Sequence, residues 1–257
     1  MPFTLAHPAA VLPLRGVRHL RIAPLIVGAM VPDLPYYLPG GIAHYVPVTH
    51  AFVHSFTVDL ALGYALLGSL VVLQRPLTAL LSVRARAMCL RALLPFRRPS
   101  EWAYAAPAIL VGVWTHLLWD SFTHADGWMV RRVAALTAPL VVGPYNGTVF
   151  HALQYLSSVA GLCVLVLWYG RLPTPAVAIG PDAARSAAGP VLVLVLAGAL
   201  LIGGVQGMEY FERTHNVYHT FFVLLTDALF WFAALYLTAG IVLTLEHGEH
   251  HLRGAGG

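Results

Sequence analysis

The sequence predicts an all-α fold, a polytopic transmembrane helix bundle that forms a single integral membrane domain over residues 1–257. Apolar residues make up 58% of the chain and charged residues only 10%, and the mean hydropathy is +0.73. Water-soluble domains contain about 25% charged residues, and disordered chains are still less apolar. The composition therefore excludes an ordinary soluble enzyme and a disordered protein, and the long apolar stretches below are the second observation behind the fold class.

About five stretches are long enough, or nearly so, to cross the roughly 30 Å of bilayer hydrocarbon, which takes about 20 helical residues. These expected spans are Ala51–Leu73, Trp102–Trp119, Val149–Tyr169, Val191–Met208 and Val217–Leu245.

Shorter segments complete the expected organisation. Two N-terminal pieces, Thr4–Leu14 and Ile22–Leu38, contain five prolines, and proline inside a helix removes a hydrogen bond and clashes with the preceding turn. They are predicted to form a broken N-terminal hairpin that is re-entrant. The segment Val133–Val142 is expected at the membrane interface, and the Pro/Ala/Gly-rich stretch Leu172–Gly189 is expected to be a linker.

Basic residues predict the orientation of the bundle. All fifteen are arginines, and six of them lie between Gln74 and Ser100. Arginine in loops that flank spans marks the cytoplasmic side. The net charge of +4 is therefore interpreted as an orientation signal, with membrane lipids as partners and no nucleic acid. The opposite ends of the neighbouring spans then face the extracytoplasmic side.

The most informative motif is a stripe of three polar side chains in an apolar span. His116, Asp120 and His124 are spaced four residues apart, a spacing that drifts by only about 40° per step around a helix. Imidazole and carboxylate are ligands that zinc prefers, and ionisable groups inside a membrane span usually mark function. The alternative is that these residues cap the helix or form hydrogen bonds at the interface. We predict a metal-binding or catalytic role, with Asp120 and His124 as the catalytic candidates.

Two further histidine pairs share this four-residue spacing. His50 and His54 begin the first span, at the end of the bundle where the Trp102–Trp119 span finishes, so antiparallel packing would bring them to the stripe. His215 and His219 lie between the last two spans on the same predicted side. They could bind a second ion or supply a proton, although polar residues are expected in any extramembrane loop.

Two N-terminal residues complete the candidate set. His7 precedes a proline, and Asp33 lies between Pro32 and Pro35, which keep its backbone away from an ordinary helix and suit a fixed carboxylate ligand. The same Pro-Asp-x-Pro pattern is also common in turns. The predicted metal ligands are His7, Asp33, His50, His54, His116, Asp120, His124, His215 and His219.

Three motifs together resemble a known family. The segments PFTLAHPAAVLPL, GAMVPDLPY and HLLWDSFTH are similar to those of a bacterial multi-pass membrane-protein family that is described only as a domain of unknown function. More distantly, the order of an N-terminal His, a Pro-Asp and a His-x-x-x-Asp resembles membrane-bound metal-dependent hydrolases and the zinc-dependent phospholipase C fold. That resemblance implies a location in the bacterial inner (plasma) membrane and a divalent metal, zinc above all. It also implies a specific ligand set: His7, Asp33, His54, His116 and Asp120, with Asp120 bridging two ions and His124 as a weaker match.

These observations lead to one preferred function and several alternatives. We predict a membrane-embedded metal-dependent hydrolase, with its site on the extracytoplasmic side, that acts on a phosphoester or lipid-like substrate. The alternatives are a transporter with a His/Asp proton relay, a structural membrane protein that binds metal for stability, and a haem protein with paired histidine ligands. Clustering of the polar residues at helix ends favours the hydrolase, because a transport path requires polar groups along the whole span.

Overall fold

A computed structural model describes residues 4–38, 46–173 and 184–254, and confirms the all-α class. These residues form two compact units. The first unit, which carries the candidate site, comprises Met1–Leu34, Tyr45–Leu67 and Phe96–Pro173. The second comprises Pro35–His44, Gly68–Pro95 and Thr174–Gly257. The two units are described separately below.

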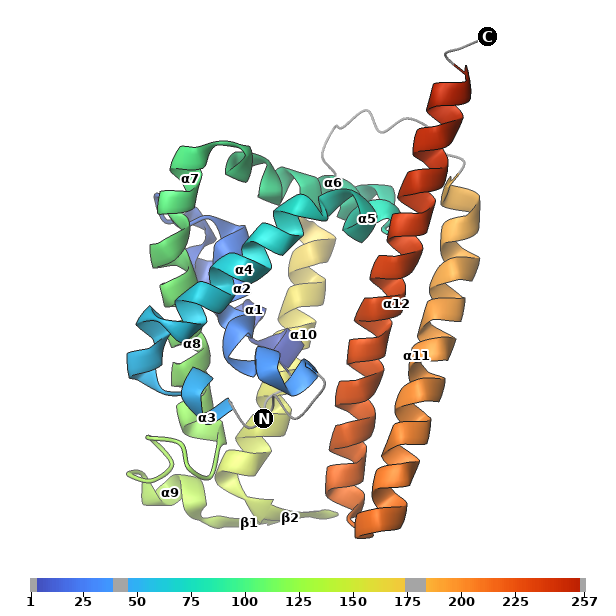
Figure 1. The fold of residues 1–257 in the computed structure, drawn as a ribbon. Coiled ribbons are helices and arrows are strands. Elements are labelled where there is room, and N and C mark those ends of the chain that lie inside the picture. The colour runs from blue at the N-terminus through green and yellow to red at the C-terminus, as the bar shows by residue number, and fades with distance from the viewer. Residues whose placement is uncertain (1–3, 39–45, 174–183, 255–257) are drawn as a thin grey trace. The chain divides into compact units, whose positions relative to one another are not determined.

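The first unit is built from short N-terminal helices and two long ones (Figure 1). Its α-helices and strands are α1 Pro8–Val11, α2 Ile22–Met30, α3 Val46–Thr49, most of α4 Val58–Val72, α7 Pro99–Ala103, α8 Ala105–Thr123, α9 Ala134–Thr137, β1 Pro139–Val142, β2 Tyr145–Thr148 and α10 Val149–Arg171. Its 3-10 helices are η1 Thr4–Ala6, η2 Leu12–Gly16, the start of η3 Val31–Tyr37, η5 Phe52–Phe56 and the end of η6 Leu94–Arg97.

Four helical segments are long and apolar enough to cross a membrane: Pro99–Thr123, Val149–Arg171, Ala188–Thr214 and His219–Glu246. They correspond to four of the five expected spans and indicate a multi-pass membrane protein. The remaining expected span, Ala51–Leu73, differs: it contains the five-residue η5 and the 15-residue α4, which is shorter than the roughly 20 residues that a bilayer requires. The break falls at Thr57, whose φ of −125° and ψ of −80° are not helical.

Prolines divide the N-terminal region, as predicted. Pro8 begins α1, where its missing N–H costs nothing, and Pro13 lies in the first turn of η2. Pro32 and Pro35 lie in η3, which directly follows α2. The region is therefore a series of short helices that change direction, and α1 packs back against α2.

Close backbone contact between α2 and α8 organises the core of this unit. A Cβ atom at Gly28 would clash with the Ile109 carbonyl, and one at Gly112 would clash with the Leu25 carbonyl. Small residues allow helices in membranes to approach this closely. Val11, Leu25, Ala29 and Ala108 form a fully buried cluster beside the contact.

Two connecting segments differ from their expected form. The expected interfacial segment Val133–Val142 contains α9 and β1, and β1 pairs antiparallel with β2 through a turn in which Gly143 has a φ of +56°. The expected linker Leu172–Gly189 lies partly outside the described residues, and its last six residues belong to the following helix.

The second unit contains α5 Gln74–Ala79, α6 Val83–Leu93 and the two longest helices, α11 Ala184–Thr214 and α12 Val217–Gly254 (Figure 1). The long helices pack antiparallel, because Gly203 of α11 contacts Ala228 of α12 and Gly207 contacts the earlier residue Leu224. Within the unit, Gly240 of α12 also packs against the backbone of Pro76 in α5.

Candidate metal centre

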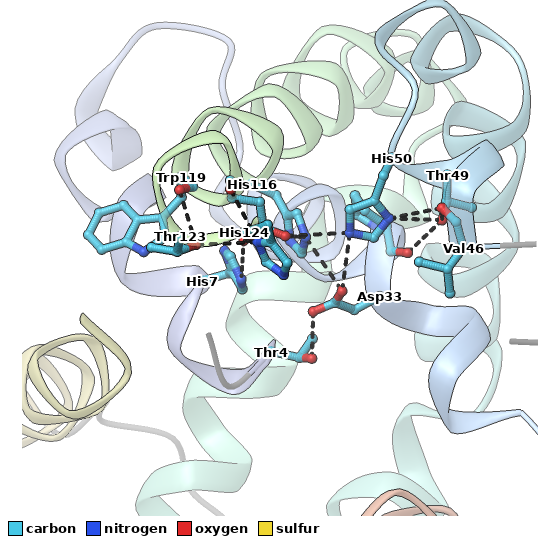
Figure 2. Close-up of polar contacts among 12 residues, drawn as sticks. Thr4, His7, Asp33, Val46, Thr49, His50, His116, Trp119, Thr123 and His124 are labelled. Atoms are coloured by element: carbon cyan, nitrogen blue, oxygen red, sulfur yellow. Dashed lines mark hydrogen bonds and ion pairs between the residues drawn. The ribbon is translucent and has the colours of Figure 1, made fainter. Parts of the chain in front are cut away.

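Four side chains from three separate segments meet in the first unit. Asp33 comes from η3, His50 follows α3, and His116 and Asp120 lie one turn apart on α8. One ligand atom from each residue lies within 4.8 Å of the other three (Figure 2). Asp33 and His116 are fully buried, and Asp120 is nearly so.

The distances between these atoms match the spacing of ligands around a small ion. Asp120 Oδ2 lies 3.2 Å from His116 Nε2 and 3.4 Å from His50 Nε2. Asp33 Oδ1 lies 3.4 Å from His50 Nε2 and 3.6 Å from His116 Nε2. Ligands that hold zinc tetrahedrally with bonds of about 2.0–2.1 Å are about 3.3 Å apart. Four of the six pairs in the cluster therefore have lengths close to the edges of such a tetrahedron.

The α2–α8 contact fixes the ring of His116. Its Nδ1 lies 2.8 Å from the carbonyl oxygen of Ala29, one residue after Gly28. A carbonyl can only accept, so Nδ1 donates, and in the neutral ring Nε2 presents its lone pair toward the cluster. A metal-binding histidine commonly has its second nitrogen held in this way.

Hydrogen bonds position the two candidate ligands that come from short helical segments, Asp33 and His50. Thr4 Oγ1 donates to Asp33 Oδ2 at 2.6 Å, which leaves Oδ1 toward the cluster. Thr49 Oγ1 donates to the Pro32 carbonyl at 2.7 Å and so links α3 to η3. His50 Nδ1 lies 3.0 Å from the Val46 carbonyl, which again orients Nε2 toward the carboxylates.

The second oxygen of Asp120 faces two further histidines. Oδ1 lies 3.5 Å from His7 Nε2 and 3.7 Å from His124 Nδ1. The His7 ring stacks on His116 with centroids 3.8 Å apart. The side chain of His7 is 1% exposed, whereas that of His124 is 23% exposed. Asp120 thus connects the other three residues of the group to a pair of additional imidazoles.

Two histidines of the cluster that lie outside the spans, His7 and His50, have opposite pKa shifts. Burial lowers the pKa of His7 to about 3, and the neighbouring His116 adds to this effect, so its ring is neutral at pH 7. Burial would also lower the pKa of His50, but the adjacent carboxylates of Asp120 and Asp33 outweigh it and raise the pKa to about 10. In the metal-free protein His50 therefore carries the positive charge that partly balances the two carboxylates.

Unpartnered polar atoms show that the cluster fits a cation. Within the described part of the chain, five of its buried atoms have no hydrogen-bond partner: His7 Nε2, Asp33 Oδ1, His116 Nε2 and both carboxylate oxygens of Asp120. Such atoms are rare in folded proteins and require an explanation. All five belong to the donor types that bind zinc, and divalent cations bound at the cluster would satisfy them.

The structure brings together six of the nine predicted ligands: His7, Asp33, His50, His116, Asp120 and His124. His54 lies on η5, outside the four-residue group. The resemblance implied His54 as a ligand, whereas the group in the structure contains His50. His215 and His219 belong to the second unit, near the junction of α11 and α12, and their role remains a prediction.

Sequence reasoning missed the two threonines that support the site. Thr4 stands at the start of the first motif, and Thr49 directly precedes His50. Both side chains are buried and donate within the site. Buried hydroxyls beside candidate ligands are a usable signal, because a hydroxyl donor can fix the orientation of a ligand carboxylate.

The comparisons with known proteins place the chain in a family. Its sequence matches, over residues 1–245, the family described as "Domain of unknown function (DUF4184)". No match is found among curated proteins or among solved structures. The match covers all six clustered residues and all four apolar spans to within one residue. The chain therefore belongs to the DUF4184 family.

Proposed function

We propose that this protein is a metal-dependent hydrolase of the bacterial inner membrane that acts on a phosphoester or lipid-like substrate. The observation that carries the proposal is the set of near-tetrahedral distances among Asp33, His50, His116 and Asp120, at atoms that are largely buried and unpartnered. Two carboxylates and two imidazoles that converge in the interior of a membrane protein are costly to bury and mark a functional site.

Two metal positions are consistent with the donors. The first would be held by Asp33 Oδ1, His50 Nε2, His116 Nε2 and Asp120 Oδ2. The second would use the other oxygen of Asp120 with His7 Nε2, 3.5 Å away, whereas His124 Nδ1 already faces the Asp120 backbone carbonyl at 3.1 Å. A divalent ion at the second position, where fewer protein ligands leave a place for water, would supply a Lewis acid and a water of lowered pKa, and zinc fits the donor set best.

The chain's own residues have separable tasks in this proposal. Asp120 would give one oxygen to each position and brings the negative charge that neutral imidazoles cannot provide. His124 is the most exposed of the four imidazoles, so it is the candidate to exchange protons with a substrate or solvent. Thr4 and Thr49 keep Asp33 and His50 in position.

The location of the cluster supports hydrolysis over transport. His116 and Asp120 lie in the last two turns of α8, and His124 follows its end. A transport path would require polar groups along the length of the span, whereas the earlier turns of α8 are apolar. With the arginine-rich segment in the cytoplasm, this end of α8 faces the extracytoplasmic side.

A matched pair of histidine variants tests the proposal. His50→Gln removes a ligand of the first position, whereas His54→Gln changes a histidine four residues away that lies outside the group. Bound metal is measured by elemental analysis of detergent-purified protein, and activity is measured as release of phosphate or of an alcohol from phosphoester substrates. We expect His50→Gln to lose metal and any phosphoesterase activity together, and His54→Gln to keep both.

Two results would contradict the proposal. Wild-type protein purified after metal-replete growth without bound metal would exclude the metal centre. A metal-loaded wild type that hydrolyses no phosphoester or lipid substrate would leave a structural metal site in place of an enzyme.

A further inference from the structure

An apolar cavity of about 470 Å³ lies beside the metal centre, between α8 and α10. Its walls include Thr115, Leu118, Trp119 and Phe122 of α8 and Leu153 and Ser157 of α10. The volume lies within the range of about 300–1,000 Å³ that is typical of ligand pockets. Both helices that line the cavity are candidate membrane spans, so a lipid of the bilayer is a ligand of suitable chemistry.

The few polar groups in the cavity are already engaged by protein atoms. Thr115 Oγ1 donates to the Gly112 carbonyl at 2.7 Å, and Ser157 Oγ donates to the Gln154 carbonyl at 3.1 Å. The Trp119 indole donates to Ser157 Oγ at 3.1 Å and so bridges the two helices. The cavity therefore offers a ligand mainly hydrocarbon surface, which suits an alkyl chain and disfavours a polar molecule.

The cavity and the metal centre use adjacent stripes of the same helix. Thr115, Trp119 and Thr123 form one four-residue series, and each is followed directly by a member of the series His116, Asp120 and His124. Thr123 connects the two, since it lines the cavity and its Oγ1 lies 3.4 Å from His124 Nδ1. Figure 2 shows Trp119 and Thr123 beside His124.

The N-terminal segment provides a second link between the cavity and the metal centre. Ala10 lines the cavity one turn after His7. A smaller hollow, lined in part by His7, Ala10, Trp119 and Ser157, continues from it. An amphiphile whose tail occupied the cavity would thus have its polar end close to the most exposed imidazole, His124.

We infer that this cavity binds one acyl chain of a bilayer phospholipid, which places the phosphate at the His124 side of the cluster. The inference rests on the proposed function and specifies its substrate class: a long-chain phospholipid that enters laterally from the membrane between α8 and α10. Acyl-chain binding contributes affinity in proportion to the apolar area that is buried. A substitution that fills the cavity should therefore weaken the binding of long-chain lipids and leave the binding of short-chain esters unaffected.

Photolabelling tests the inference without requiring catalysis. Purified protein in detergent is mixed with a phospholipid that carries a diazirine in the middle of one acyl chain, irradiated, and mapped by peptide mass spectrometry. We expect labels to concentrate on Leu118–Phe122 and Leu153–Ser157. Leu153→Trp fills part of the cavity and should reduce this labelling about tenfold. That factor is expected when about two methylene groups of the acyl chain are no longer buried.

A neighbouring residue provides the control. Leu156 lies on the same helix, is 68% exposed and does not line the cavity, so Leu156→Trp should label as the wild type does. Equal labelling of Leu153→Trp and wild type, or labels spread evenly over the exposed apolar residues of α10, would overturn the inference. Labelling of the cavity in a protein that binds no metal would support the acyl-chain site and contradict the proposed hydrolase, so the two failures are distinguishable.

Discussion

At the scale of single residues, Asp120 is the centre of the site. Its two oxygens face four imidazoles: His116 and His50 on one side, and His7 and His124 on the other. The second buried acid of the cluster, Asp33, differs, because one of its oxygens accepts a hydrogen bond from Thr4. The negative charge of Asp120 is therefore shared by both proposed metal positions.

Asp120→Asn tests this central role. The substitution keeps the shape and removes the charge, and loss of even an outer-shell partner costs about 10–100-fold in metal affinity. We expect a loss at least as large, measured as metal content after dialysis against a weak chelator. Asp126→Asn, at an exposed position beyond α8, should retain wild-type metal content. Equal metal content in Asp120→Asn and wild type would exclude Asp120 as a ligand.

The charge state of His50 predicts that metal binding releases a proton. The pKa of His50 is raised to about 10, so the metal-free site holds this proton at pH 7, while His7, with a pKa of about 3, is already neutral. Ligand histidines must be deprotonated, so zinc affinity should rise about tenfold per pH unit below pH 10 for one released proton. Calorimetric titrations in two buffers of different ionisation enthalpy measure that proton. Zinc affinity that does not change between about pH 6 and pH 8 would contradict the assignment.

At the scale of elements, the contact between α2 and α8 determines whether the site forms. Gly28 and Gly112 let the two backbones touch, and the same contact presents the Ala29 carbonyl to His116 Nδ1. Asp33 follows α2 within the next turn, so the position of this helix also sets the position of a second ligand. Packing and metal binding are therefore coupled through one interface.

Gly112→Ala is expected to disrupt both properties. Its methyl group would clash with the Leu25 carbonyl and would lie 2.8 Å from the Ala29 amide nitrogen, and overpacking of this kind costs about 1–3 kcal/mol. We expect a lower melting temperature and a lower metal content in detergent. Gly170→Ala, where an added Cβ atom would have open space around it, is the control and should be neutral or slightly stabilising. A Gly112→Ala protein with wild-type stability and metal content would show that the helices can separate without harm.

At the scale of the whole molecule, four apolar spans and an asymmetric distribution of arginine indicate how the chain is inserted. The segment Gln74–Ser100 contains α5, α6 and the start of α7, and carries six of the fifteen arginines. A cytoplasmic location for this segment follows from the positive-inside rule. The opposite location would place the proposed site in the cytoplasm.

Cysteine labelling tests this orientation. Cys89 is exposed on α6, and the other cysteine, Cys163, lies within the α10 span. A Cys163→Ser protein therefore reports on Cys89 alone, and Cys89→Ser provides the background. A membrane-impermeant maleimide should modify Cys89 in inverted vesicles and not in intact cells. Modification in intact cells would reverse the topology and move the metal centre to the cytoplasmic side.

The sequence by itself determined the membrane class, four of the spans and the spacing of the ligands on α8. These features depend on local properties: apolar length decides which helices can span a bilayer, and the helical repeat aligns His116, Asp120 and His124 whatever surrounds them. The prolines around Asp33 likewise predicted a non-standard backbone, which the structure contains as η3.

The tertiary structure alone decided which distant residues complete the site. His50 and His54 have the same spacing and the same kind of neighbours in the sequence, but only His50 joins Asp33 and Asp120. Backbone conformation makes this choice: Thr49 ties α3 to the Pro32 carbonyl, and the chain leaves helical geometry at Thr57. The cavity beside the centre also arises only when α8 packs against α10, since its walls come from residues far apart in the chain. Interactions between distant segments depend on packing in three dimensions, which no local pattern of residues specifies.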